Sequence, residues 1–216
     1  MKRVHLAIIG IIILTFAISI ALYPGLPDRV ASHWNASGQV DGYMPKFWGI
    51  FLVPLLMLGF TALLAFIPRI DPKRANYEKF QGYYDGLILV FALFFMAIQL
   101  MILLWASGIP ISPNLLFPVL IGALFYYLGI LLDHTEPNWF VGIRTPWTLS
   151  SETVWKKTHK RGALAFKIAG VISVLGILVP DYAVYLILAL AIGVGVYTVV
   201  YSYREYQNEQ QGSPVT

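Results

Sequence analysis

Two polar segments of an otherwise apolar chain hold most of the side chains that could bind a ligand or move a proton. Residues 24–46 contain His33 and Asp41, which could bind a metal, transfer a proton or pair with each other. Residues 138–161 contain Arg144, Glu152 and His159. A guanidinium binds carboxylates and phosphates through paired hydrogen bonds, so Arg144 could pair with Glu152 or Asp133, or hold a lipid phosphate.

The first segment leaves the presence of a metal open. Zinc usually takes three or four protein ligands, and this segment offers His33, with Asp41 and Asp28 as weaker candidates. Its glycines and prolines indicate turns rather than a long helix. The simpler interpretation is that His33 and Asp41 hydrogen-bond to hold the fold of the segment, which ends at Lys46.

The second segment carries signals for a turn followed by a helix. Gly142 favours a turn just before Arg144, and Pro146 biases Thr145 toward an extended backbone. Ser150 or Ser151 then offers an N-cap to a helix.

On that helix, Glu152 would lie in the positively polarised first turn. Glu152, Trp155 and His159 are spaced to share one face. We therefore predict a structured cap on a helical bundle, with Arg144 and Glu152 as its electrostatic centre. His159 could also approach His134 as a proton relay or a weak metal pair.

A plainer role for the same segment is anchoring at a membrane surface. Tryptophan is enriched at the edges of bilayers, and basic side chains meet anionic headgroups. The residues concerned are Trp139, Trp147, Trp155, Lys156, Lys157, Lys160 and Arg161.

The composition indicates the kind of scaffold that must position these residues. The 216 residues are 58% hydrophobic and only 12% charged, whereas soluble domains average about 45–50% apolar and about 25% charged residues. The mean hydropathy of +0.69 also favours a membrane protein. Cysteine is absent, which excludes disulfides and thiolate sites. No HExxH, GxSxG or phosphate-cradling glycine motif occurs, so we expect neither an enzyme nor a cofactor.

Six stretches are long and apolar enough to cross a bilayer, which takes about 20 residues as a helix. They are residues 4–23, 47–68, 84–106, 114–132, 162–179 and 182–203. Backbone polar groups cannot stay unpaired in lipid, so we predict an all-α, multi-pass protein of the cell membrane with a retained first span.

The basic residues predict its orientation. Twelve of the fifteen lysines and arginines fall in the connections and ends on one side, two fall on the other, and Lys167 lies within a span. By the positive-inside rule both termini are cytoplasmic, loop 24–46 is extracytoplasmic and loop 133–161 is cytoplasmic. This placement in short loops argues against direct nucleic-acid binding.

Several residues within the spans have structural interpretations. Pro54 and Pro118 predict kinks, and the small pair Ala189 and Gly193 predicts a close helix approach. Gln99 is expected to join helices by hydrogen bonds. Lys167 is expected to reach toward the membrane surface.

The two polar segments resemble the SdpI family of membrane proteins and the small uncharacterised two-span domain that often precedes it. The C-terminal resemblance is carried by Asn138, Phe140, Gly142, Ile143, Arg144, Thr145, Pro146, Thr148, Leu149, Ser150, Glu152, Trp155 and His159. The N-terminal resemblance is carried by Leu26, Pro27, Val30, His33, Gly38, Asp41, Gly42 and Lys46.

The resemblance implies a two-span domain over residues 1–70, a four-span SdpI-like domain over residues 84–203 and a tail at 204–216. It implies protection of the producing cell from a secreted antimicrobial peptide by binding. Some members also signal by recruiting a cytoplasmic transcriptional repressor. The expected partners are thus the lipid bilayer, a secreted toxic peptide and a repressor.

Two other functions stay open from the residues alone. A small ion-coupled transporter would use Gln99, Tyr126 and Tyr127 along its path, with Lys167 or His159 coupling protons. A metal-dependent membrane hydrolase would need His33, or His134 with His159, to hold the metal.

Overall fold

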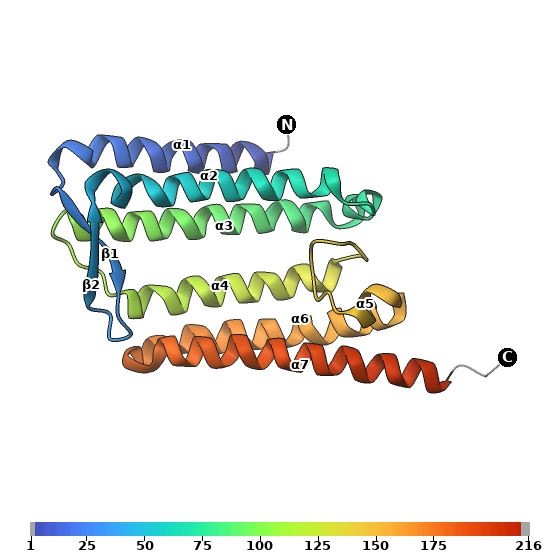
Figure 1. Ribbon diagram of the computed structural model, residues 1–216. Helices are drawn as coiled ribbons and strands as arrows, with labels where there is room; N and C mark the ends of the chain where they lie inside the picture. The colour runs from blue at the N-terminus through green and yellow to red at the C-terminus, as the bar shows by residue number, and fades with distance from the viewer. Residues whose placement is uncertain (1–2, 213–216) are drawn as a thin grey trace.

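Six long helices run side by side in this computed structural model, which describes residues 3–212 (Figure 1). They are α1 (Arg3–Leu22), α2 (Lys46–Ile70), α3 (Tyr77–Ala106), α4 (Pro113–His134), α6 (Glu152–Leu175) and α7 (Ala183–Gly212). Each is long and apolar enough to cross a membrane. The chain is therefore a multi-pass membrane protein, and the expectation of six spanning helices is confirmed.

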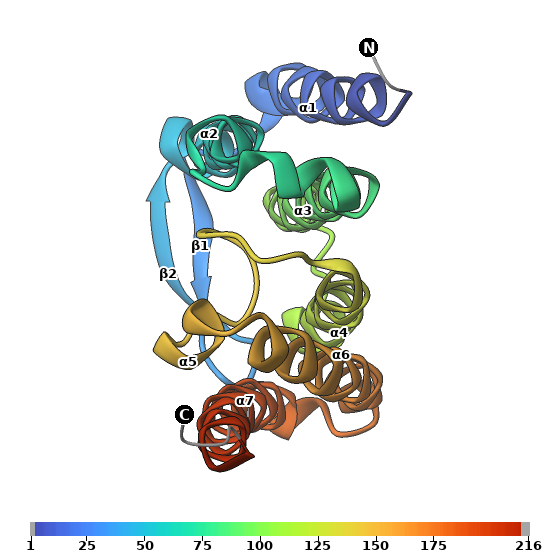
Figure 2. The same cartoon turned by 90° about the vertical axis from the view of Figure 1, so that its right-hand side faces the viewer.

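The helices form two groups of three (Figures 1 and 2). Helices α1, α2 and α3 pack against one another, and α4 packs against α6, which packs against α7. Between α4 and α6 the backbones approach closely, because a Cβ on Gly170 would lie 2.7 Å from the carbonyl oxygen of Gly122. The Ala189–Gly193 pair makes no such approach, since a Cβ on Gly193 would meet nothing within 4 Å among the described residues.

The two ends of the bundle carry different structures (Figure 1). The hairpin end carries β1 (Arg29–Trp34) and β2 (Val40–Pro45), which pair antiparallel. The cap end, opposite, carries the short helix α5 (Pro146–Ser150), the start of α1 and the described end of α7. Short 3-10 turns lie at Tyr23–Gly25, Arg74–Asn76, Gly176–Leu178 and Pro180–Tyr182.

Two details differ from the sequence-based expectations. Residues 29–45 were expected to form turns, and the structure has a β-hairpin there. The chain beyond residue 203 was expected to be a separate tail, but α7 continues to Gly212. The last four residues of that tail lie outside the described residues.

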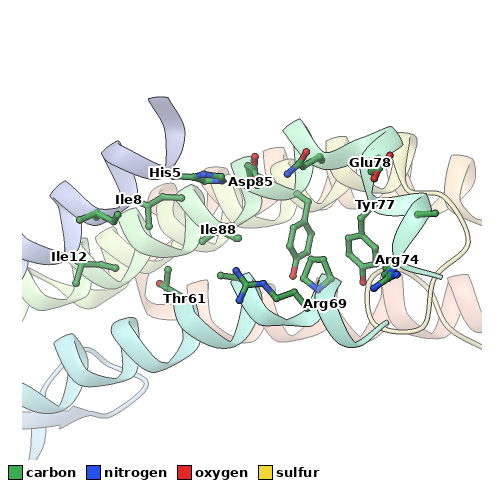
Figure 3. Close-up of a pocket in the computed structure, with 16 residues that line it drawn as sticks. His5, Ile8, Ile12, Thr61, Arg69, Arg74, Tyr77, Glu78, Asp85 and Ile88 are labelled. Carbon is green, nitrogen blue, oxygen red and sulfur yellow. Dashed lines mark ion pairs between the residues drawn. The ribbon is translucent and has the colours of Figure 1, made fainter. Parts of the chain in front are cut away.

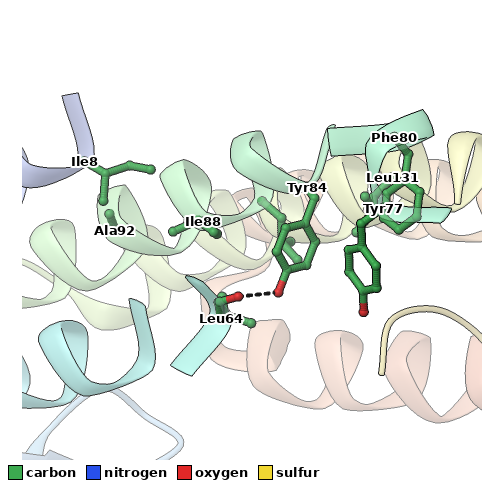
Figure 4. Close-up of a cluster of buried hydrophobic side chains, with 9 residues drawn as sticks. Ile8, Leu64, Tyr77, Phe80, Tyr84, Ile88, Ala92 and Leu131 are labelled. Carbon is green, nitrogen blue, oxygen red and sulfur yellow. Dashed lines mark hydrogen bonds between the residues drawn. The ribbon is translucent and has the colours of Figure 1, made fainter. Parts of the chain in front are cut away.

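Prolines in α2 are matched by polar side chains of α3. Proline lacks an N–H, so Pro54 and Pro68 leave the carbonyls four residues earlier without their helical donors. The Gln99 amide donates to the carbonyl of Ile50 at 2.8 Å, and the Tyr84 hydroxyl donates to that of Leu64 at 2.6 Å (Figure 4). These bonds hold α2 on α3, and Gln99 also donates to Ser19 of α1.

The remaining polar span residues also contact neighbouring helices. The Tyr127 hydroxyl donates to the carbonyl of Tyr83 at 2.9 Å. Lys167 forms an ion pair with Asp133 at the cap end of α4. Each interaction joins two helices, which is the structural role expected of Gln99.

Candidate functional site

The hairpin presents an ion pair at its surface. His33 Nδ1 lies 2.5 Å from Asp41 Oδ1, and the two side chains are 72% and 45% exposed. The pairing register places His33 opposite Gly42, where a Cβ would lie 2.9 Å from that of His33. His33 and Asp41 are thus brought together as the sequence interpretation anticipated.

The hairpin is anchored to both helix groups. The amide of Asn114, on α4, donates to the carbonyl of Ala36 at 2.9 Å. Lys46 starts α2, and its ammonium lies 4.7 Å from the centre of the Tyr23 ring. The exposed His33–Asp41 pair is therefore held on a rigid support, while Lys46 is occupied in stabilising the base.

At the cap end, residues 135–145 form a loop that we name the motif loop. Asn138 organises its first half and is only 1% exposed. Its side-chain oxygen accepts from the backbone N–H groups of Phe140 and Val141, and its amide donates to the carbonyls of Glu136 and Val141. Asn138 therefore fixes the loop backbone.

The second half of the motif loop packs against the imidazole of His159 and hydrogen-bonds to it. Gly142 has a φ of +115°, and a Cβ there would lie 2.3 Å from His159 Nε2. The N–H of Ile143 donates to this nitrogen at 3.1 Å, and Nδ1 lies 2.9 Å from the carbonyl oxygen of Trp155. His159 must then be neutral with its proton on Nδ1, because Nε2 accepts a hydrogen bond. The Trp155 ring stacks on the imidazole at 3.9 Å.

Thr145 and Pro146 start α5. Thr145 is extended and accepts from the N–H of Thr148, which donates its hydroxyl to the Ile143 carbonyl. Pro146 occupies the first turn, where its missing N–H costs nothing. The Thr145 hydroxyl also donates to Ser202 of α7 at 3.1 Å. We name the motif loop, α5 and the first two turns of α6 the cap.

Arg144 and Glu152 are the exposed charged residues of the motif. One guanidinium nitrogen of Arg144 donates to the carbonyl of Trp139 at 2.8 Å. Ser151 caps α6 as expected, and Glu152 follows in its first turn. Among residues 3–212 no ion pair joins Arg144 to Glu152 or to Asp133. Asp133 pairs with Lys167 instead.

The three residues predicted to share one face of α6 differ in burial. Trp155 and His159 are buried inside the cap, whereas Glu152 is exposed. Trp155 therefore does not anchor the protein at a lipid interface. Its indole donates to the carbonyl of Thr135 at 3.0 Å, which ties α6 to the end of α4.

His134 and His159 line one small cavity, but their rings contact different partners. His134 stacks on Tyr83 at 3.6 Å, whereas His159 stacks on Trp155. Within the described part of the chain, no group of three or more His, Asp or Glu side chains is placed to hold a metal.

Asp71 is a site residue that the sequence reasoning missed. Its buried carboxylate accepts from the N–H groups of Lys73 and Trp139 and from the hydroxyl of Tyr77. Tyr77 also reaches Asn138, and the Asn76 amide donates to the carbonyl of Pro137 at 2.6 Å. The Asp-Pro pair at a helix end was the available signal, because aspartate there commonly accepts from the N–H two residues on.

Comparison with known proteins agrees with this arrangement. Residues 10–58 match a domain of unknown function, DUF1648, and residues 134–202 match the SdpI/YfhL protein family. The chain is 27% identical over 208 residues to the immunity protein SdpI of Bacillus subtilis (strain 168), and the match spans 96% of this chain and 97% of that protein. The chain is thus similar to the SdpI/YfhL protein family over its C-terminal third, and to one SdpI protein along nearly its whole length. No solved structure matches this chain.

The SdpI-family match contains the cap and the hydroxyl of α7 that Thr145 contacts. The DUF1648 match contains most of α1, the hairpin and the first half of α2. The SdpI-family resemblance read from the two polar segments is therefore confirmed.

Proposed function

We propose that this protein is a membrane immunity protein of the SdpI family that protects the cell from a secreted antimicrobial peptide. The observation that carries the proposal is similarity along nearly the whole chain to a protein named as an immunity protein. Protection acts by binding rather than by catalysis, and the sequence carries no recognisable catalytic motif.

In this proposal both termini are cytoplasmic and the hairpin faces outward. The excess of basic residues on the side of the termini and of the cap supports this orientation. The exposed His33–Asp41 pair then meets the peptide on a support anchored to both helix groups. Residues 1–70 supply most of this outer surface.

The cap faces the cytoplasm and offers a docking surface to a transcriptional repressor. The exposed Arg144 guanidinium is oriented by the Trp139 carbonyl and has further N–H groups to donate. Glu152 adds an exposed carboxylate near the same end. A partner with charged side chains of both signs would fit these groups.

A resistance assay tests the proposal. Sensitive cells expressing the protein are challenged with the secreted peptide fraction of its source strain, and survival is compared with empty-vector cells. We expect the wild-type chain to protect. We expect the His33→Ala/Asp41→Ala variant to protect less at equal membrane abundance.

Ser37→Ala, at the exposed hairpin tip, is the matched control and should retain protection. Absence of protection by wild-type protein present in the membrane would overturn the immunity function. Arg144→Ala that leaves repressor recruitment to membranes unchanged would overturn the role of the cap.

A further inference from the structure

A groove of about 760 Å³ lies between α1 and α2, with α3 as its floor (Figure 3). It is open to solvent at the cap end and extends along the helices toward the middle of the bundle. Neither polar segment singled out by the sequence lines it. The groove is therefore separate from the hairpin surface, although Tyr77 borders both the groove and the motif loop.

The lining of the groove changes character along its length. Arg69 and Arg74 lie at the cap end. Ile8, Ile12 and Ile88 line the part nearer the middle of the bundle. This order matches an amphiphile that enters with its polar head at the membrane surface and its chain along the helices.

The charges at the mouth favour an anion. Arg69 and Arg74 are exposed, and no carboxylate lies within 4 Å of either among residues 3–212. The lining carboxylates are Glu78 and Asp85, and Asp85 lies 3.3 Å from His5. Two unpaired guanidiniums match the oxygens of a phosphodiester.

A buried threonine borders the apolar part of the groove. Thr61 is 8% exposed, and its hydroxyl has no hydrogen-bond partner among the residues that the structure describes. Thr15 and Thr198 instead donate to the carbonyl one helical turn earlier. Thr61 lines the groove, and Figure 3 shows Arg69 extended along the groove in its direction. An unpaired buried donor costs free energy unless a partner is supplied.

We propose that this groove binds one membrane phospholipid. Arg69 and Arg74 hold its phosphodiester, and an acyl chain lies along the isoleucines. Because Tyr77 lines the groove and also donates to Asp71 and Asn138, the bound headgroup lies beside the motif loop.

Binding to the full-length protein in an uncharged detergent tests the site, with native mass spectrometry as the measurement. The probes are dioctanoyl-phosphatidylglycerol, dioctanoylglycerol without the phosphate, and glycerol phosphate without the chains. We expect only the first to be retained as a one-to-one adduct. The Arg69→Gln/Arg74→Gln variant should bind it roughly fivefold or more weakly, because each exposed charge pair contributes up to about a factor of five.

Two further variants separate this site from general effects. Lys73→Gln/Lys79→Gln removes the same charge from the same connection but does not line the groove, so binding should be retained. Thr61→Val should retain binding, and the lipid-free protein should melt at an equal or higher temperature because an unpaired buried hydroxyl is removed.

Three results would overturn the proposal. Equal retention of dioctanoylglycerol would show that the arginines do not hold a phosphate. Equal binding of glycerol phosphate would show that no acyl chain is needed. An equal loss of binding in the lysine variant would show that only bulk charge matters.

Discussion

The imidazole of His159 is held between two backbone groups and an indole ring. Replacement by leucine leaves the buried N–H of Ile143 without its acceptor, so we expect His159→Leu to destabilise the protein by about 1–3 kcal/mol. Thermal unfolding in detergent measures this. Lys156→Gln, at an exposed side chain that lines the same cavity, should change stability by less than about 0.5 kcal/mol. Equal losses would contradict the role assigned to His159.

A side chain at Gly142 would be disfavoured both by the backbone conformation and by a steric clash. Its φ is +115°, and a methyl group added to it would lie 2.3 Å from His159 Nε2. Gly142→Ala should therefore destabilise the protein by about 1–3 kcal/mol. Gly82→Ala in α3 has open space around it and should stabilise by up to about 1 kcal/mol. Opposite shifts in melting temperature are expected, and a shift of the same sign would refute the argument.

At the scale of single residues, local rules predicted what depends on neighbours in sequence. The extended Thr145, the Ser151 cap and the hydrogen bond between His33 and Asp41 follow from such rules. The choice of partner for Arg144 and the burial of Trp155 depend on how the motif loop folds back on α6. That folding is set by Asn138 and Asp71, whose partners lie on distant segments.

At the scale of elements, the prolines of α2 give a specific coupling to α3. Tyr84→Phe removes the hydroxyl that donates to the Leu64 carbonyl, which Pro68 leaves without its helical donor. In a Pro68→Ala background the N–H of residue 68 can again donate to the Leu64 carbonyl. Tyr84→Phe should therefore lower the free energy of unfolding by less in that background. We expect a coupling of about 0.6 kcal/mol, typical of hydrogen bonds between membrane helices.

A double-mutant cycle on unfolding free energies measures that coupling. Tyr126→Phe, at an exposed tyrosine of α4, is the control and should show additive behaviour with Pro68→Ala. Additive effects of Tyr84→Phe and Pro68→Ala would contradict the coupling.

Hydropathy predicted where the helices cross the membrane but not where they end. Helix α7 continues to Gly212 and α6 begins at Glu152, because polar residues with good helix propensity prolong a helix outside lipid. The hairpin was missed although short runs rich in valine and aromatic residues flank a turn at Gly38. Gly42 and Pro45 of that segment indicate turns, but both lie in β2.

At the scale of the molecule, the proposed orientation can be tested with few perturbations because the chain has no native cysteine. Ser37→Cys places a thiol at the hairpin tip, and Ser150→Cys places one on α5. A membrane-impermeant maleimide should label the first in intact cells and the second only after lysis. Labelling in the reverse order would show that the protein is inserted the other way.

The number of spans was predictable because burial of backbone polar groups in lipid leaves little choice. The grouping of the six helices into two sets of three was not predictable. Helix α3 packs with α1 and α2 as well as with α4, and nothing in its apolar sequence indicates which neighbours it prefers.

The hydrogen bonds of Asp71 and Asn76 also set an order in which parts of the protein can form during synthesis. The donors and acceptors described above that join α1, α2 and α3 lie before residue 107, so that group can complete them while later residues are still being translated. The Asp71 carboxylate instead waits for the N–H of Trp139, and Asn76 waits for Pro137. The junction between the two helix groups at the cap end is therefore among the last parts of the protein to form. In a chain interrupted before residue 137, the Asp71 carboxylate keeps the N–H of Lys73 and the hydroxyl of Tyr77 but lacks the N–H of Trp139.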